Sequence, residues 1–175
     1  NTLDLDDSLA PFVADSLRLA SVFVAPWPRQ IVWQESKLVD CHRFLAGLFH
    51  LVARHEGALR GHAPPREPSE LLRRLHRETA EITGAFEGRR LNVTVHGLMR
   101  LRRVIEEAEE AAVPGEEGAI VEGLSRLARM LAPLAPHLAE SLWQRLGGEG
   151  FASVAPWPEA DESVLGEEGR PLCVQ

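Results

Sequence analysis

The sequence predicts an all-α protein, an antiparallel up-down bundle of five to six helices with a proline-kinked last helix and an extended C-terminal tail. Apolar residues recur at helical spacing in successive stretches, and short segments containing Gly or Pro separate these stretches. No stretch shows the strict alternation that would support a β-sheet. The chain of 175 residues is about one domain. Its longest uncharged apolar run is far shorter than the ~20 residues that span a membrane.

The first two helices are delimited by capping residues and by proline. The first is expected from Asp7, which can cap it, to about Val24, after which prolines follow. A short extended piece, 31–33, precedes the second helix, which Ser36 can cap and which continues to about His55. The apolar positions of the second helix are expected to face the core: Val39, Leu45, Leu48, Phe49 and Val52.

Glycine, proline and a serine delimit the next two helices. Segment 57–68 is rich in Gly and Pro and is expected to be a surface loop. Ser69 can cap the third helix, which Gly88 ends. The fourth helix is expected from Leu91 to about Ala112, just before a Pro-Gly pair.

Two prolines interrupt the helical pattern near the end of the chain. The fifth helix begins near Glu116. Pro133 lacks the N–H that would bond back along this helix, and its ring crowds a carbonyl, so the helix must kink or end there. Pro136 is well placed as the first residue of a new helical segment, which continues to Gly147. The remaining tail, 149–175, is rich in Gly, Pro and acidic residues and is expected to be an extended wrap or linker.

Charge is unevenly distributed along the chain, whose formal net charge is −7. Residues 41–105 carry twelve basic and six acidic side chains, whereas residues 106–175 carry four and fourteen. Every basic residue of the middle segment is an arginine, and the planar guanidinium of arginine suits phosphate. This asymmetry suggests one basic face on an acidic body; the alternative is a solvated helix face in an arginine-rich sequence.

Sequence signatures of catalysis are absent. The chain has no Gly-rich phosphate loop and no G-x-S-x-G motif, and its seven histidines and two cysteines lack metal-ligand spacing. We therefore predict no catalytic residue, no metal site and no cofactor site in this chain. His137 and Glu140 have the i,i+3 spacing of a pair on one helix face. The tryptophans are expected to plug the core and helix ends rather than to stack on bases: Trp27, Trp33, Trp143 and Trp157.

The stretch MLAPLAPHLAESLWQRLG, residues 130–147, resembles a segment in the anticodon-binding helical bundle of class Ia aminoacyl-tRNA synthetases. Further segments resemble the leucyl-tRNA synthetase family of bacterial and organellar type, and they cover nearly the whole chain in the family's order. These segments are NTLDLDD at 1–7, ADSLRL at 14–19, WQES at 33–36, RFL at 43–45, LH at 75–76, LNVTVHGLM at 91–99, WPEADE at 157–162 and VQ at 174–175.

This resemblance implies a domain organisation. Residues 1–148 would form an anticodon-binding-type bundle, with 1–35 including the connection from a catalytic domain, and residues 149–175 would lead toward a C-terminal domain. In this family the bundle holds the tRNA body and anticodon stem and generally does not read the anticodon. Ligation of leucine to tRNA(Leu) proceeds through an adenylate in a separate catalytic domain. ATP with Mg²⁺ and leucine are expected there, and this chain is expected to be inactive alone.

The resemblance also implies which arginines contact tRNA. Arg43 stands at the RFL arginine of the family and is expected to contact a phosphate; an ion pair with Asp40 or Glu35 is the alternative. The family usually has a second arginine one helical turn later, where this chain has Gly47. Weaker candidates for tRNA contact are Arg73, Arg74, Arg77, Arg100, Arg102 and Arg103.

Two hypotheses for function remain. The first is a tRNA-binding bundle that positions tRNA(Leu) in protein synthesis, beside an intramolecular catalytic domain and a C-terminal domain. The second is a synthetase-derived helical module that mediates protein–protein interaction without aminoacylation, which Gly47 and the acidic C-terminal third motivate. For either, we expect no membrane association and no oligomer, and a location in the bacterial cytoplasm or the mitochondrial matrix.

Overall fold

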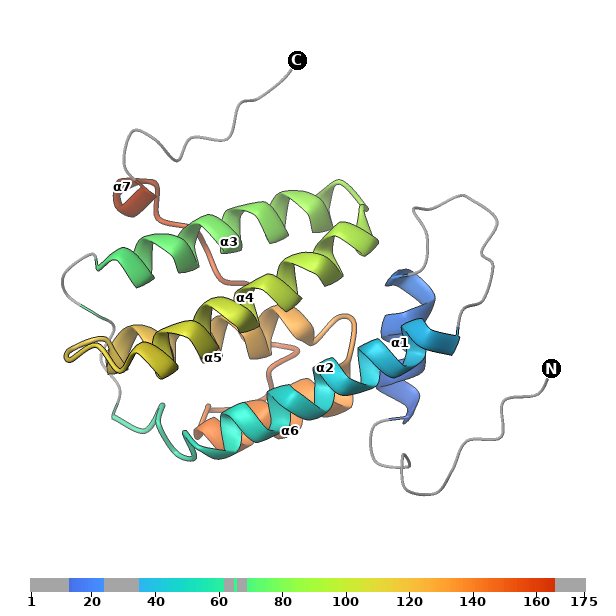
Figure 1. Ribbon diagram of the computed structural model, residues 1–175, viewed down its shortest axis with the longest axis horizontal. Helices are drawn as coiled ribbons and strands as arrows, with labels where there is room; N and C mark the ends of the chain where they lie inside the picture. The colour runs from blue at the N-terminus through green and yellow to red at the C-terminus, as the bar shows by residue number, and fades with distance from the viewer. Residues whose placement is uncertain (1–12, 24–34, 62–64, 66–68, 166–175) are drawn as a thin grey trace, which may run out of the picture.

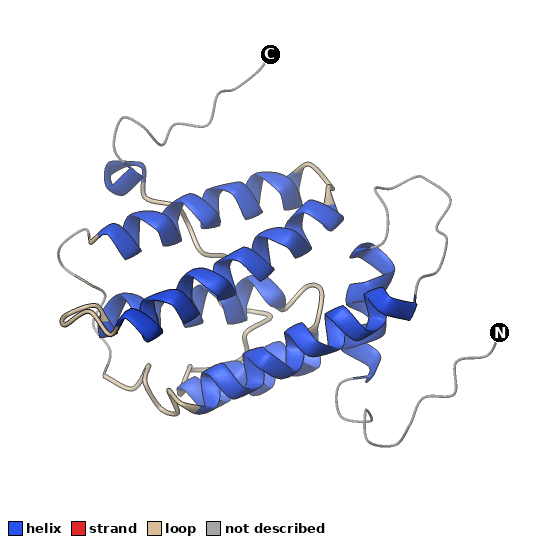
Figure 2. Cartoon of the chain, viewed as in Figure 1, coloured by secondary structure: helices blue, strands red, loops and turns tan. Residues whose placement is uncertain are grey.

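The computed structural model describes residues 13–23, 35–61, 65 and 69–165. Within these residues the chain forms helices and no strand, which confirms the all-α class (Figures 1 and 2). None of the described helices has the length and apolar character that a membrane span needs. The helices are α1 Val13–Phe23, α2 Glu35–Ala53, α3 Glu70–Glu87, α4 Leu91–Ala111, α5 Glu117–Leu131, α6 Pro136–Leu146 and the short α7 Glu162–Leu165.

Neighbouring helices pack along their lengths. Helix α3 packs on α4, α4 on α5, and α5 on α6, while α2 contacts α6 (Figure 1). Helix α1 lies at one end of the molecule and contacts α2, α4 and α6. The short α7 packs against α3.

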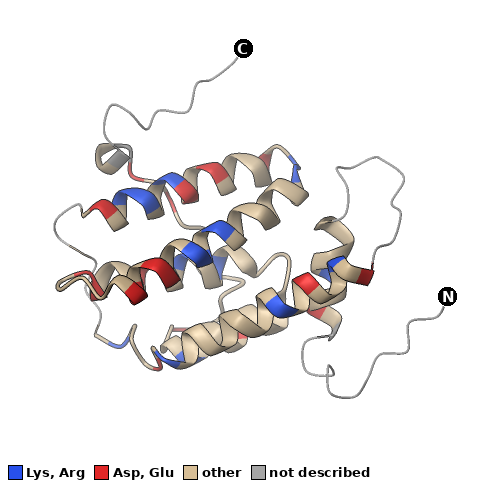
Figure 3. Cartoon of the chain, viewed as in Figure 1, with Lys and Arg blue, Asp and Glu red and all other residues tan. Residues whose placement is uncertain are grey.

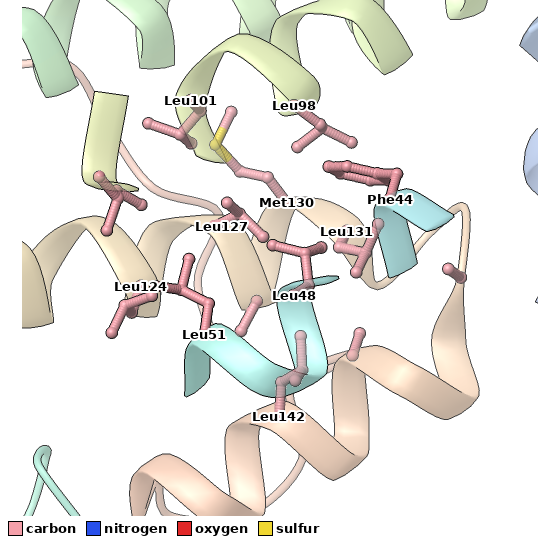
Figure 4. Packing of buried hydrophobic residues seen from close by; sticks show 14 of the residues in the cluster. Phe44, Leu48, Leu51, Leu98, Leu101, Leu124, Leu127, Met130, Leu131 and Leu142 are labelled. Carbon is pink, nitrogen blue, oxygen red and sulfur yellow. The ribbon is translucent and has the colours of Figure 1, made fainter. Parts of the chain in front are cut away.

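One continuous hydrophobic core joins α2, α4, α5 and α6. Figure 4 shows side chains of these four helices directed toward one another. Each such leucine or methionine stabilises the fold by about 1.5–3 kcal/mol when it is fully buried. The residues at the centre of this core are Leu48, Leu51, Leu98, Leu101, Leu124, Leu127, Met130, Leu131 and Leu142.

Local signals in the sequence delimit α3 as predicted. The Leu72 N–H donates to Ser69 Oγ at 3.1 Å, so Ser69 is the N-cap of this helix. Gly88 is its C-cap: the Gly88 N–H donates to the Gly84 carbonyl at 3.2 Å, and the Arg89 N–H donates to the Phe86 carbonyl at 2.9 Å. Helix α4 ends at Ala111, within a residue of the predicted end.

The second helix differs from its prediction at its start and in one core position. It begins at Glu35, so Ser36 lies within its first turn and is not its N-cap, contrary to the prediction. The prediction that Val39 faces the core is wrong, because its side chain is 48% exposed. Leu45, Leu48 and Val52 are buried as predicted, and Phe49 is partly buried against the core. The predicted extended piece 31–33, the start of the first helix, and Trp27 and Trp33 lie outside the described residues.

The prolines separate two helices at the predicted place. Helix α5 ends at Leu131, and Pro136 is the first residue of α6. Between them, the N–H groups of Leu134 and Ala135 both donate to the Leu131 carbonyl at 2.9 Å. Pro133 has no N–H to donate to the Arg129 carbonyl, and that carbonyl instead accepts from the Ala132 N–H at 3.3 Å.

A residue of α1 caps the start of α6. Asp15 is 1% exposed, and its Oδ2 accepts from the Leu138 N–H at 2.7 Å. His137 Nδ1 lies 2.9 Å from Asp15 Oδ1. A carboxylate near the first N–H groups of a helix satisfies unpaired donors and complements the positive end of the helix dipole. His137 does not use the pairing with Glu140 that its spacing would allow, and Glu140 instead accepts from the backbone N–H groups of Ala152 and Ser153.

The chain after α6 crosses α3 and α5, and we call its residues 151–161 the strap. Trp157 stacks on Phe86 of α3 with 5.1 Å between ring centroids, and its Nε1–H donates to Thr83 Oγ1 at 2.9 Å. On α5, Arg126 donates to the Glu159 carbonyl at 2.8 Å and Arg129 to the Pro156 carbonyl at 3.2 Å. The strap is therefore fixed by stacking and by side-chain donors rather than by a ladder of backbone hydrogen bonds.

His76 holds the last residue of the strap and must be neutral to do so. The backbone N–H of Asp161 donates to His76 Nδ1 at 2.8 Å, so this nitrogen acts as an acceptor. The other ring nitrogen lies 3.5 Å from Arg126 Nη2. Burial, and next the positive charge of Arg126, lower the pKa of His76 below its usual value of 6.5.

Acidification is expected to weaken the attachment of the strap. Because the folded pKa of His76 is lowered, its stabilising contribution is fully present above the unfolded value and is lost as pH falls through the folded pKa. His76→Asn keeps an acceptor but does not titrate. Between pH 7.5 and about pH 5, the wild type should lose more free energy of unfolding than His76→Asn, as measured by urea denaturation at each pH. Parallel curves for the two proteins would contradict this role.

Candidate nucleic-acid interface

The candidate arginines lie on three helices. Arg43 is on α2; Arg73, Arg74 and Arg77 are on α3; Arg100, Arg102 and Arg103 are on α4. Figure 3 shows basic residues along the middle of α4, acidic residues toward its C-terminal end, and both signs along α3. The basic middle third of the sequence therefore does not form a face of one sign.

Most of these arginines are paired with glutamates of the same or a neighbouring helix. Arg74 and Arg103 both contact Glu107 at 2.9 Å, and their hydrogen bonds, that of Arg74 first, hold the pKa of Glu107 below its usual value. Exposed pairs of this kind are weakened by solvent screening, so they organise the surface more than they stabilise the fold. The other pairs are Arg73–Glu70 at 3.4 Å, Arg100–Glu78 at 3.0 Å, Arg100–Glu81 at 2.6 Å and Arg102–Glu106 at 2.7 Å.

Arg43 and Arg77 differ from the other candidates. Both are exposed, and among the described residues neither makes an ion pair. In particular, the described contacts of Arg43 include no ion pair with Asp40 or Glu35, the alternative that its sequence position left open. The charge of Arg43 is therefore not neutralised by a described carboxylate.

Arg43 lines a cleft between α1, α2 and α4, which we call the arginine cleft. Its volume is about 380 Å³. Its apolar lining consists of Phe23, Phe44 and Met99. Its charged lining consists of Arg43, Arg102 and Arg103 with Asp40 and Glu106. Three cations and two anions give the lining residues a balance of one positive charge beside an apolar surface, although Glu107, outside the lining, pairs with Arg103.

Because Gly47 has no side chain, the guanidinium of Arg102 can lie against α2 at this position. A Cβ built on Gly47 would lie 2.5 Å from Arg102 Cζ, closer than real side chains approach one another. Arg102 donates from Nη1 to the Phe44 carbonyl at 3.2 Å, and from Nε and Nη2 to Glu106 at 2.9 and 2.7 Å. Gly47 thus removes a side chain from α2, and a guanidinium from α4 occupies the space.

Chemistry other than binding finds no support among the described residues. They contain no group of three or more His, Cys, Asp or Glu that could hold a metal ion. Cys41 is buried, and this burial raises the pKa of its thiol to about 12, so the nucleophilic thiolate is not populated near neutral pH. His76 is held neutral beneath the strap. What the described surface offers is arginine donors around a cleft.

The sequence identified the arginines of this cleft but not its other parts. Phe23 and Phe44 lie at least 76 and 55 positions from Met99 and Arg102 along the chain, and only the packing of α1 and α2 on α4 brings them together. Glycine within a helix was the one signal that could have pointed to the close approach of Arg102. The pairing of the remaining arginines with glutamates across helices carried no sequence signal.

Known proteins resemble this chain over most of its length. Residues 69–171 match the family model described as the anticodon-binding domain of tRNA ligase. The chain is 34% identical over 185 residues to a leucine–tRNA ligase of Afipia carboxidovorans and 33% identical over 183 residues to one of Sodalis glossinidius. Both alignments cover 100% of this chain and 21% of the relative, so the chain spans about a fifth of the length of these relatives.

A solved structure shares the fold. A LeuRS of Agrobacterium radiobacter K84, in a ternary complex with tRNA and LeuAMS, superposes with a TM-score of 0.77. The match covers 92% of this chain and 21% of that chain at 24% sequence identity. Together with the sequence similarities, it confirms the resemblance predicted from the ordered segments of the sequence.

Proposed function

The chain belongs to the anticodon-binding domains of tRNA ligases, and on that premise we propose that it is the helical bundle with which a leucine–tRNA ligase holds tRNA(Leu). The relatives that match the whole chain are leucine–tRNA ligases, and none of these similarities supports the alternative of a protein-interaction module. In this proposal residues 1–148 form the bundle with its connection from the catalytic domain, and residues 149–175 lead toward a C-terminal domain.

One observation of the structure carries the proposal: an exposed arginine, Arg43, without a described carboxylate partner, beside a positively balanced cleft. A guanidinium in this setting donates charge-assisted hydrogen bonds to phosphate without first breaking an ion pair. Phosphate and sugar contacts position a nucleic acid but carry no sequence information directly. The bundle therefore positions tRNA by its backbone. Arg73, Arg74, Arg100 and Arg103 contribute less because glutamates pair with them.

The rest of the ligase reaction takes place outside this bundle. ATP with Mg²⁺ and leucine bind the catalytic domain, and the bundle supplies no catalytic residue. Its partners are tRNA(Leu), the catalytic domain and the C-terminal domain, and it needs no second copy of itself. We place the protein in the bacterial cytoplasm rather than the mitochondrial matrix, since the relatives named above are bacterial.

Replacing Arg43 with alanine should weaken tRNA binding by about tenfold, because one charge-assisted contact is lost. The slope of log affinity against log salt should become shallower by about one unit. Both quantities are measured by titrating labelled tRNA(Leu) with the chain at several salt concentrations. In a ligase that carries the same change, kcat/KM for leucylation should fall by a similar factor.

Arg54→Ala is the matched control. Arg54 directly follows the last residue of α2, eleven positions beyond Arg43, and Glu109 pairs with it through both carboxylate oxygens. Its removal should leave the salt slope unchanged. If Arg43→Ala behaves like this control, or leaves leucylation by the ligase unchanged, then Arg43 is not a tRNA contact.

A further inference from the structure

We infer that Arg102, reaching across Gly47 from α4, acts with Arg43 of α2 to bind one phosphodiester of the RNA backbone in the arginine cleft. This inference rests on the proposed function and deepens it, because it assigns the phosphate site to two helices rather than to α2 alone. A Cβ at position 47 would displace the guanidinium of Arg102 from its place in this site.

The guanidinium of Arg102 keeps donors for a ligand. A guanidinium has five N–H donors, and Arg102 uses three in its contacts with Glu106 and the Phe44 carbonyl. The two that remain belong to a side chain that is 22% exposed and lines the cleft. Paired nitrogens in the plane of a guanidinium match the oxygens of phosphate.

The environment of Arg102 holds this donor fork in place before a ligand arrives. Glu106 binds one edge of the guanidinium, the Phe44 carbonyl accepts from Nη1, and the Phe44 ring centroid lies 6.0 Å from Cζ. A side chain already ordered in the free protein loses little conformational entropy on binding. Glu106 is thus a positioning residue, although its charge reduces the positive balance of the cleft.

Arg43 supplies a guanidinium with no ion-pair partner among the described residues, whereas Arg102 is paired with Glu106. The charge of Arg43 is unpaired among the described contacts and its side chain is exposed, so it can move toward a phosphate from α2 while Arg102 donates from α4. Phe23 and Phe44, 7% and 5% exposed, give the cleft an apolar lining, and the Phe44 ring lies near the guanidinium of Arg102. Apolar surface lowers the local dielectric constant and strengthens the attraction between phosphate and guanidinium.

Gly47 is explained by this site and not by the geometry of its helix. Glycine weakens a helix interior relative to alanine, and no positive φ requires glycine at position 47. The contact that excludes a Cβ there is with the guanidinium of Arg102. Gly84 in α3 offers a matched comparison, since a Cβ there would meet nothing within 4 Å.

The test is a mutant cycle on tRNA binding by the chain, with labelled tRNA(Leu) titrated at several salt concentrations. Arg102→Ala and Gly47→Ala should each weaken binding about tenfold and make the salt slope shallower by about one unit. The double variant should bind no more weakly than Arg102→Ala alone, because Gly47→Ala acts by displacing the Arg102 guanidinium. Gly84→Ala should bind like the wild type.

Each contrary result has a distinct meaning. If Arg43→Ala weakens binding but Arg102→Ala keeps the wild-type affinity and salt slope, the two-helix site is wrong and the proposed function stands. Full additivity of Gly47→Ala and Arg102→Ala also overturns the site, because the glycine would then act independently. If the wild-type chain does not bind tRNA at low salt, the proposed function fails and the site fails with it. Arg102→Ala creates no steric conflict, so the test does not depend on whether Gly47→Ala folds.

Discussion

Replacing Asp15 with alanine is expected to lower the free energy of unfolding by about 2–3 kcal/mol, because its buried carboxylate caps a helix that has no cap of its own. Ala135, the N-cap residue of α6, has no side-chain acceptor, and Asp15 accepts from the Leu138 N–H instead. Hydrogen bonds to a charged group contribute about 1.5–3 kcal/mol, and the loss leaves a buried donor without a partner. Urea denaturation followed by circular dichroism measures the change.

The free-energy cost of removing a local helix cap gives a reference value for this prediction. Ser69→Ala removes the N-cap of α3 and should cost about 1 kcal/mol. Asp15→Asn keeps the size of the side chain and one carbonyl acceptor, so its cost should fall between those of the two alanine variants. If Asp15→Ala unfolds within 0.5 kcal/mol of the wild type, which is the usual range of surface substitutions, the link between α1 and α6 does not stabilise the fold.

The second large effect is expected at Arg126, whose replacement by alanine should cost about 3 kcal/mol. Arg126 is 7% exposed and donates to Thr79 Oγ1 at 3.3 Å and to the Glu159 carbonyl. Its Nε lies 2.8 Å from Glu122 Oε1, although the N–H does not point at that oxygen and makes no hydrogen bond. Removing one partner of a buried ion pair costs about 3–5 kcal/mol because the other charge stays buried, and the partial exposure of Glu122 places the value at the low end.

A control variant distinguishes the effect of detaching the strap from the effect of simply truncating an arginine side chain. Arg129→Ala is the control, because Arg129 also donates to a strap carbonyl from α5 but is more exposed. It should cost about 1 kcal/mol. Amide hydrogen exchange at Asp161 should accelerate strongly in Arg126→Ala and weakly in the control. Equal unfolding free energies for the two variants would contradict this prediction, because removing the buried Arg126 would then cost no more than removing Arg129.

Local features of this fold were predictable from the sequence, because neighbouring residues determine them. Ser69 caps α3 through a residue three positions away, and Pro136 begins α6 because its φ suits the first turn and its missing N–H is not needed there. Val39 was assigned to the wrong face because helix phase from apolar spacing is uncertain where polar and apolar positions alternate irregularly.

Contacts between distant residues were not predictable. Asp15 and Leu138 are 123 positions apart, and nothing in the α1 sequence distinguishes a capping aspartate from a solvated one. The same holds for the candidate interface. The resemblance of the RFL segment identified Arg43, but the glutamates that pair with Arg74, Arg100 and Arg103 became evident only once the helices were packed. Because these glutamates pair with arginines, counting charges along the sequence overstated the number of unpaired basic side chains on the surface.

The most direct test of the account is the affinity of the wild-type chain for tRNA(Leu) and for the same tRNA with its anticodon bases replaced, each measured across a range of salt concentrations. If the bundle holds tRNA by backbone phosphates, the two RNAs should bind with equal affinity and with the same steep salt dependence. A strong preference for one anticodon would contradict positioning by the backbone. Absence of binding to either RNA at low salt would contradict the assignment of this bundle to tRNA.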